Sequence, residues 1–334
     1  MEVLNMKMRK LRDLEVTEIG MGCMGFSHGY GAVPEESYSI EAIRKAHDFG
    51  CNFFDTAEVY GMQQFEKGHN ERLVGKALEP FRKNVILATK LHIDTVEPEQ
   101  DGSLYNTIRR HLEASMEKLR TDYIDLYYLH RVNPDIPVED VAEVMGRLIK
   151  EGLIRGWGMS MVNTELIERV QSITPLTAVQ NIYSMMDRDY EKKVIPYCFE
   201  HNIGFVAFSP IASGFLSGKV TTETKFGFDD VRTWVPQMKK ENIAANQPVL
   251  ELIKSYTEAK NATNAQIALA WMLKKYPHVV PIPGSKNQNR ILENLGAWQI
   301  KLSDEEFKEL DDSLSRITVH GNRRDVGFAT EYID

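Results

Sequence analysis

The chain has 334 residues, 43% of them hydrophobic and 26% charged, and a net charge of −8 at pH 7. These values are ordinary for a globular protein with a sizeable core, and they argue against long disorder and against a basic nucleic-acid-binding surface. The first residues alternate charge and hydrophobe, and no stretch approaches the roughly 20 apolar residues of a membrane span, so we expect a cytoplasmic protein with no nucleic-acid or membrane partner. The sequence does not indicate an oligomeric state.

The predicted elements begin with a short antiparallel hairpin over residues 8–11 and 14–17. Apolar strands then alternate with helices. Strands are predicted at 19–24, 52–55, 85–89, 123–129, 154–159, 178–180, 205–209 and 279–282, and helices at 35–49, 70–78, 104–119, 138–150, 164–172, 194–200, 249–259, 264–275, 290–296 and 304–314. Eight strand-and-helix units without a change in composition predict the α/β class and a (β/α)8 TIM barrel with an N-terminal β-hairpin, as one domain over 1–334.

In such a barrel, the loops that follow the strands carry the function. Asp55 ends the second predicted strand, and Tyr60 lies just after it. Lys90 ends the third strand and His130 ends the fourth. Because parallel strands in a closed barrel end at the same rim, we expect these four side chains to lie together.

These residue types fit one reaction. Carbonyl reduction by hydride transfer needs an acid that protonates the developing alkoxide, and tyrosine, with a pKa of about 10, serves only if a neighbour lowers that pKa. We expect Lys90 to do this, Asp55 to hold Lys90 as an ion pair, and His130 to hydrogen-bond the substrate oxygen or relay the proton. Each residue alone could be packing, capping or solvated, but their recurrence at three strand ends favours catalysis.

Eight segments in order make the sequence similar to the aldo-keto reductase superfamily over nearly its whole length. They are IGMGCMG, FFDTAEVYG, ILATK, YYLHR, GWGMS, AVQNIYS, FSPIASGFLSGK and IPGSKNQNRILENLGA. The resemblance implies an NADPH-dependent reductase of small-molecule aldehydes or ketones. It also implies that the four rim residues are the catalytic tetrad, with Tyr60 as the proton donor.

The resemblance further implies a cofactor site. Ser160 and Gln180 match positions that hydrogen-bond the nicotinamide carboxamide, and Phe208 matches the aromatic residue that stacks on the ring. The other implied contacts are Gly22, Cys23 and Met24 after the first strand, Ser209, Pro210, Ile211, Gly214, Leu216 and Lys219 along the pyrophosphate, and Gly284, Ser285, Lys286, Gln288, Arg290 and Asn294 after the eighth strand. Lys286 and Arg290 are the expected contacts of the 2′-phosphate and adenosine, which favours NADPH over NADH.

The sequence departs from the family pattern at two positions. Met161 stands where much of the family has Asn, and Ile182 where many members have Glu. Fewer carboxamide contacts are therefore expected, and Tyr183 is left open as a site residue.

Several loops show little transferable signal and are expected to set the substrate: 26–32, 92–102, 213–238 and the tail from 319. The long loop after the seventh strand is a candidate cofactor clamp, with Phe226, Phe228 and Trp234 as possible pocket walls. Glu58 and His92, near the rim, are expected to be solvated or to line the pocket.

Two other motifs do not support a different function. Gly20, Gly22 and Gly25 spell GxGxxG, but no helix can start promptly after them, as a Rossmann turn requires. The three cysteines lack CxxC spacing, so reduced thiols are expected rather than a metal site or a disulfide.

The alternative function, from another class, is a non-catalytic NADPH-binding regulatory subunit, which the complete tetrad disfavours.

Overall fold

Eight parallel strands close into a barrel in the computed structural model of the chain, which describes residues 6–321. The strands are β3 (Met21–Gly22), β4 (Phe53–Asp55), β5 (Ile86–Leu91), β6 (Ile124–Leu129), β7 (Ile154–Ser160), β8 (Ala178–Ile182), β9 (Gly204–Phe208) and β10 (Val279–Pro281). Each pairs with the next in chain order. The barrel closes where the Gly20 N–H donates to the Pro281 carbonyl over 2.9 Å and Gly22 pairs in parallel with Gly284. The predicted (β/α)8 barrel is confirmed.

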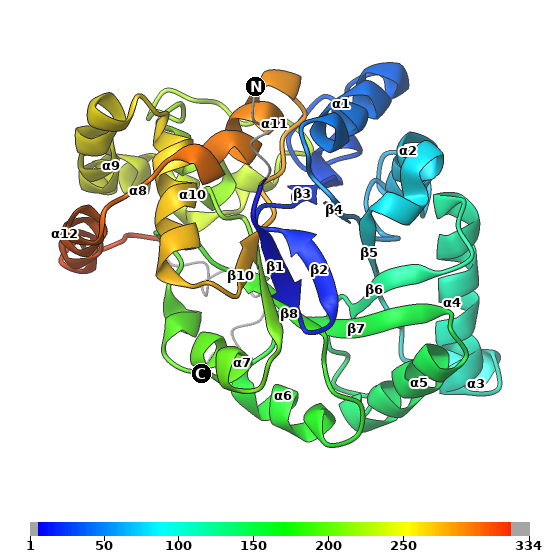
Figure 1. Cartoon of the computed structure of the whole chain (residues 1–334). Helices are drawn as coiled ribbons and strands as arrows, with labels where there is room; N and C mark the ends of the chain where they lie inside the picture. The colour runs from blue at the N-terminus through cyan, green and yellow to red at the C-terminus, as the bar shows by residue number, and fades with distance from the viewer. Residues whose placement is uncertain (1–5, 322–334) are drawn as a thin grey trace.

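Helices surround this barrel (Figure 1). They are α1 (Glu36–Asp48), α2 (His69–Leu78), α3 (Glu97–Gln100), α4 (Leu104–Leu119), α5 (Val138–Lys150), α6 (Thr164–Gln171), α7 (Val194–Glu200), α8 (Lys240–Ala245), α9 (Gln247–Lys260), α10 (Asn264–Lys275), α11 (Gln288–Leu295) and α12 (Asp304–Ser315). In α5 the buried residues recur at three- and four-residue intervals, which gives the helix one apolar face toward the strands. Among residues 6–321, no helix combines the length and the apolar content needed to cross a bilayer.

The core has two layers. Strands β5 and β6 are buried at every position, as expected of parallel strands covered on both faces. One apolar cluster fills the barrel interior and includes Phe53, Leu126 and Val206, and a larger cluster lies between strands and helices. The strands are therefore fixed from both sides, which holds their ends at defined positions.

An N-terminal hairpin covers one end of the barrel (Figure 1). Its strands are β1 (Met8–Leu11) and β2 (Leu14–Thr17), with the predicted bounds. Leu11 and Leu14 join the interior cluster, and the Arg9 guanidinium donates to the carbonyls of Leu273 and Tyr276, each over 2.7 Å. The hairpin closes the end where the strands begin, so the functional loops lie at the opposite end.

The first barrel strand is shorter than predicted. A strand was expected over 19–24, but β3 covers Met21–Gly22 only, and the chain then turns into a short 3-10 helix, Met24–Phe26. After Cys23 the backbone bonds are local, because the Phe26 N–H donates to the Cys23 carbonyl at 3.2 Å and the Ser27 N–H to the Met24 carbonyl at 3.0 Å, so turn bonds replace strand pairing. The short helices α3 and α8 were also missed.

Substituting Gly204 tests how closely the hairpin packs on the barrel. A Cβ at this position, the first residue of β9, would lie 2.3 Å from Leu11 Cδ2 and 2.7 Å from Leu11 Cα. Since the clash involves backbone, Gly204→Ala should lower the free energy of unfolding by about 1–3 kcal/mol, measured by urea denaturation. Gly227→Ala, where the added atom meets nothing within 4 Å, is the control. Equal stability of the two variants would contradict the described packing.

Candidate active site

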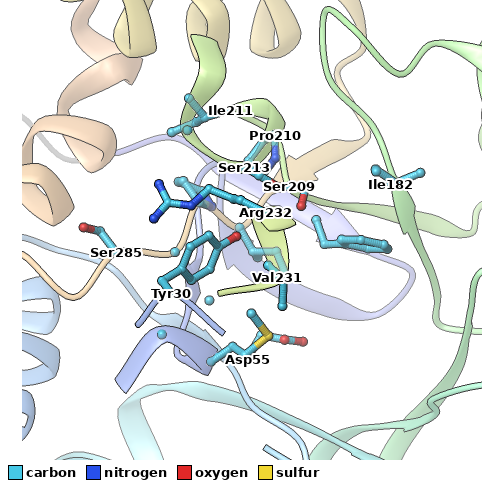
Figure 2. A pocket seen from close by; sticks show the side chains of 18 of the residues that line it. Tyr30, Asp55, Ile182, Ser209, Pro210, Ile211, Ser213, Val231, Arg232 and Ser285 are labelled. Carbon is cyan, nitrogen blue, oxygen red and sulfur yellow. The ribbon is translucent and has the colours of Figure 1, made fainter. Parts of the chain in front are cut away.

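A cavity of about 690 Å³ opens where the barrel strands end. This volume is typical of small-molecule sites. Residues in or after the carboxyl-terminal parts of strands on all sides of the barrel line it, including Met24, Tyr60, His130, Gln180 and Gly284. Figure 2 shows part of the wall, with Asp55 across the cavity from Pro210 and Ile211. The cavity therefore lies where the sequence analysis placed the function.

Three of the four predicted tetrad residues meet through one buried ammonium group. The Lys90 side chain is fully buried and donates to Asp55 Oδ1, to the Thr56 carbonyl at 2.7 Å and to the Tyr60 hydroxyl at 3.3 Å. The other oxygen of Asp55 accepts a hydrogen bond from Gln180 Nε2 at 2.8 Å. Neighbouring strands β4 and β5 hold this arrangement, because Asp55 ends β4 opposite Ala88, two residues before Lys90 on β5.

The fourth residue completes the group. The His130 ring lies edge-on to the Tyr60 ring, with 5.7 Å between their centroids. Burial lowers the pKa of His130 well below its ordinary value, and the cations Arg131 and Lys90 lower it further. The imidazole is therefore neutral at pH 7.

The acidity of Tyr60 differs from the expectation. Burial raises the pKa of Tyr60 above its ordinary value, and the opposing effect of Lys90 does not outweigh it. Burial also lowers the pKa of Lys90, but Asp55 and Tyr60 raise it to a net value above the ordinary one. The expected fall in the tyrosine pKa was wrong for this structure, because the sequence names the charged neighbours but not the extent of burial. At neutral pH Tyr60 holds its proton and Lys90 is charged.

Most of the residues predicted for the cofactor line the cavity. They are Gly22, Met24, Ser160, Gln180, Phe208, Ser209, Pro210, Ile211, Gly214, Lys219, Gly284, Ser285, Lys286, Arg290 and Asn294. Cys23 and Leu216 do not, because both are fully buried in the core. The Gln288 side chain is also outside, bonded to Lys45 Nζ and to the Tyr38 carbonyl. Of the departures noted above, Met161 and Ile182 line the cavity.

The segment after β9 has the backbone of an open cradle. Ser209 and Gly214 both have positive φ, 51° and 94°, which turns the chain sharply beside the cavity. A Cβ on Gly214 would meet nothing within 4 Å, so a ligand can approach this backbone. Among residues 6–321, no carboxylate lies within ion-pair distance of Lys219 or Arg290. These observations fit a dinucleotide with phosphates near two unpaired cations.

Lys286 is used differently. Its ammonium donates to the carbonyls of Tyr30 and Ala32, at 2.7 and 2.6 Å, so it holds the loop after β3 in place. Within the described chain, Arg290 therefore has the freer positive group of the two predicted phosphate contacts.

The long loop after β9 reaches across the cavity to the loop after β3. Tyr30 and Asp230 form an isolated antiparallel β-bridge through their backbones, and the Val231 N–H donates to the Gly29 carbonyl at 3.0 Å. Arg232 forms an ion pair with Asp230 and lies over the Tyr30 ring, 5.4 Å from its centroid (Figure 2). Residues 200 positions apart in the sequence are thus joined over the cavity mouth.

The three aromatic residues of this loop have different surroundings. Trp234 lines the cavity, although it is 66% exposed. Phe226 packs against the Arg232 guanidinium, 4.6 Å from ring centroid to Cζ, and does not line the cavity, so it was wrongly expected as a wall. Phe228 is 96% exposed and is not a cavity wall, so the expectation for it was wrong. Tyr183, left open above, lies outside the cavity and donates to Glu191 at 2.6 Å.

Glu58 holds the segments at the rim of the barrel together, a structural role that the sequence analysis did not predict. It is buried rather than solvated, and it accepts hydrogen bonds from the His92 N–H and from His111 Nδ1, each at 2.8 Å. Its own N–H donates to the Lys90 carbonyl at 3.2 Å. Glu58 therefore joins the loop of Tyr60 to the strand end of Lys90.

Residues 18–315 match the sequence model of the Aldo/keto reductase family. Probable aldo-keto reductase 1 of Glycine max is 36% identical over 92% of this chain and 88% of its own length. Aldo-keto reductase yakc [NADP(+)] of Schizosaccharomyces pombe is 33% identical over 96% of this chain and 94% of its own. The solved structure of glycerol dehydrogenase AKR11B4 from Gluconobacter oxydans superposes with a TM-score of 0.81 at 25% identity, covering 96% of this chain and 98% of that one.

Glu71, which shares a small second cavity with Glu58, should make stability depend on pH. It is buried and accepts a hydrogen bond from Thr89 Oγ1, and burial raises its pKa from 4.5 to about 7. Between these values the unfolded chain ionises first, so the free energy of unfolding falls as pH rises from 4.5 to 7. Glu71→Gln should remove up to about 3 kcal/mol of this fall.

The measurement is urea denaturation between pH 4.5 and 8. Glu99→Gln, at an exposed position of α3, controls for loss of a carboxylate. A Glu71→Gln curve parallel to that of the wild type would show that Glu71 does not carry the effect.

Proposed function

Because the chain belongs to the aldo/keto reductase family of oxidoreductases, we propose that it reduces aldehydes or ketones to alcohols with NADPH as hydride donor and Tyr60 as proton donor. The name of the Schizosaccharomyces pombe relative includes NADP(+), which supports the choice of cofactor. The observation that carries the proposal is the buried Lys90 ammonium, bonded to both Asp55 and the Tyr60 hydroxyl at the cavity.

When bound, NADPH supplies a hydride to the carbonyl carbon. Negative charge then grows on the carbonyl oxygen, and the proton of the Tyr60 hydroxyl moves to that oxygen to give the alcohol. The phenolate left on Tyr60 lies 3.3 Å from the Lys90 ammonium, which stabilises it until it regains a proton from solvent. Asp55 and the Thr56 carbonyl keep the ammonium oriented during the transfer.

His130 has a separate role in this mechanism. Because burial keeps its imidazole neutral, a ring N–H can hydrogen-bond the carbonyl oxygen without placing a second full charge beside Lys90. It therefore orients the substrate while Tyr60 remains the proton source.

The remaining cavity residues fit the cofactor. Gln180 uses one N–H of its Nε2 for Asp55, which leaves its carbonyl oxygen and its second N–H for the nicotinamide carboxamide. Phe208 is half-buried and offers a ring face for stacking. Lys219 and Arg290, without carboxylate partners among the described residues, would bind phosphate.

Tyr60→Phe tests the proton donor. The variant keeps the ring but lacks the hydroxyl, so NADPH oxidation with a panel of aromatic and aliphatic aldehydes should fall by about 10²–10⁴-fold in kcat. NADPH binding, followed by fluorescence, should be nearly unchanged. Full-rate turnover by the variant would remove Tyr60 from the mechanism. NADPH binding by the wild type without turnover of any carbonyl compound would instead support a non-catalytic cofactor-binding subunit.

Arg290→Ala tests the 2′-phosphate contact. Loss of a charge-assisted hydrogen bond of about 1.5–3 kcal/mol should raise the Kd for NADPH by roughly 10- to 100-fold and change that for NADH little. Lys45→Ala is the charge-matched control, since Lys45 bonds Gln288 near the same helix but does not line the cavity. Equal effects of Arg290→Ala on both cofactors would count against the assignment.

A further inference from the structure

Arg131 is a cavity residue that neither the proton transfer nor the cofactor assignment uses. It directly follows His130 after β6, is half-buried and lines the cavity. Its Nη1 donates to the His130 carbonyl at 2.5 Å and to Ser160 Oγ at 3.1 Å. These bonds fix the guanidinium between the tetrad and the residue expected at the nicotinamide.

The guanidinium has no anionic partner. Among residues 6–321, no carboxylate lies within ion-pair distance of Arg131, and its Nε and Nη2 donate no hydrogen bond. The charge is nevertheless felt by the tetrad, because it lowers the pKa of His130 and opposes the rise in that of Tyr60. A half-buried cation with unused donors beside the reacting hydroxyl is arranged to meet an anion from outside the chain.

The other charged residues of the cavity are already committed. Arg232 is paired with Asp230, and Lys286 donates to two backbone carbonyls. Lys219 and Arg290 lie on the segments after β9 and β10 that fit the cofactor phosphates. Arg131 is therefore the cation that remains for the substrate.

The carboxylates that line the cavity do not neutralise the charge of Arg131. Asp55 holds Lys90, and Asp187 accepts from Ser184 and Gln237. The others are bonded in the same way: Asp189 pairs with Lys192, Asp229 accepts from the Gly29 N–H, and Glu293 accepts from Thr263. Each has a partner other than Arg131.

We propose that Arg131 binds a carboxylate carried by the carbonyl substrate, so that oxo acids and aldehyde acids are preferred to neutral carbonyl compounds. The planar fork of the guanidinium matches the two oxygens of a carboxylate, and its fixed place beside His130 and Ser160 orients the bound substrate toward Tyr60. This inference rests on the proposed carbonyl reduction and names its substrate class.

A competing role for Arg131 is to hold the nicotinamide carboxamide, since Met161 removes the usual amide contact. Ser160 and Gln180 are the residues already assigned to that group in the proposed function, and a neutral amide does not compensate the charge of a guanidinium. The test separates the two roles, because a cofactor role affects every substrate alike.

The experiment compares each acid with its methyl ester in the same enzyme preparation. The pairs are 4-oxobutanoate, 2-carboxybenzaldehyde and 4-carboxybenzaldehyde with their esters, which vary the distance from carbonyl to carboxylate. We expect wild-type kcat/KM to favour the acid in at least one pair by about tenfold or more, and Arg131→Gln to lower that ratio by about 10- to 100-fold. Arg131→Lys keeps the charge but not the planar fork, so its acid-to-ester ratio of kcat/KM should lie between those of the wild type and Arg131→Gln.

Arg316→Gln, the same change at the exposed end of α12, is the control and should keep the wild-type ratio. Esters preferred in every pair, or an equal loss for acid and ester in Arg131→Gln together with weaker NADPH binding, would overturn the inference.

A binding measurement separates this inference from the proposed function. Calorimetric titration of benzoate into the enzyme with NADP(+) present should give binding at least tenfold weaker for Arg131→Gln than for wild type. If no carbonyl compound is turned over but this difference is found, the proposed reduction fails and the anion site stands. If turnover is found but benzoate binds both proteins equally, the anion site fails alone.

Discussion

The buried ion pair between Lys90 and Asp55 is the interaction on which the site depends. Transferring two charges from water to the protein interior is costly, and only close pairing with further hydrogen bonds offsets that cost. Here the Thr56 carbonyl, the Tyr60 hydroxyl and the Gln180 amide supply those bonds. The pair itself joins the neighbouring strands β4 and β5, whereas the Gln180 bond comes from β8, which is not a neighbour of β4 in the sheet. The full set of bonds therefore depends on strands from different parts of the barrel.

The barrel and the position of its site could be predicted from the sequence for a simple physical reason. Apolar strands that alternate with helices have few ways to bury both faces, and parallel strands of a closed barrel end at one rim. Asp55 and Lys90 could thus be placed together although 35 residues separate them. The N-terminal hairpin could also be predicted, since the alternation of apolar and polar residues that indicates it lies within one short segment.

The rest depends on packing between distant segments, which no local pattern records. Burial rather than a charged neighbour dominates the pKa of Tyr60. Lys286 could not be told from Arg290 by sequence, because its partners are carbonyls of a loop more than 250 positions away. Arg131 was visible in the matched segment YYLHR, yet its unpaired state appears only once every carboxylate near the cavity has been located.

The hairpin at the start of the chain has a consequence for the order of events at the far end. The strands β1 and β2 cover the end of the barrel where its strands begin, and the cavity opens at the other end, where the joined loops around Tyr30 and Asp230 cross its mouth. In the proposed reaction the cofactor and the carbonyl substrate share that cavity mouth. When both molecules use this mouth, the one that lies deeper is expected to enter first and leave last, so the covered end of the barrel bears on the order of binding in the proposed reaction.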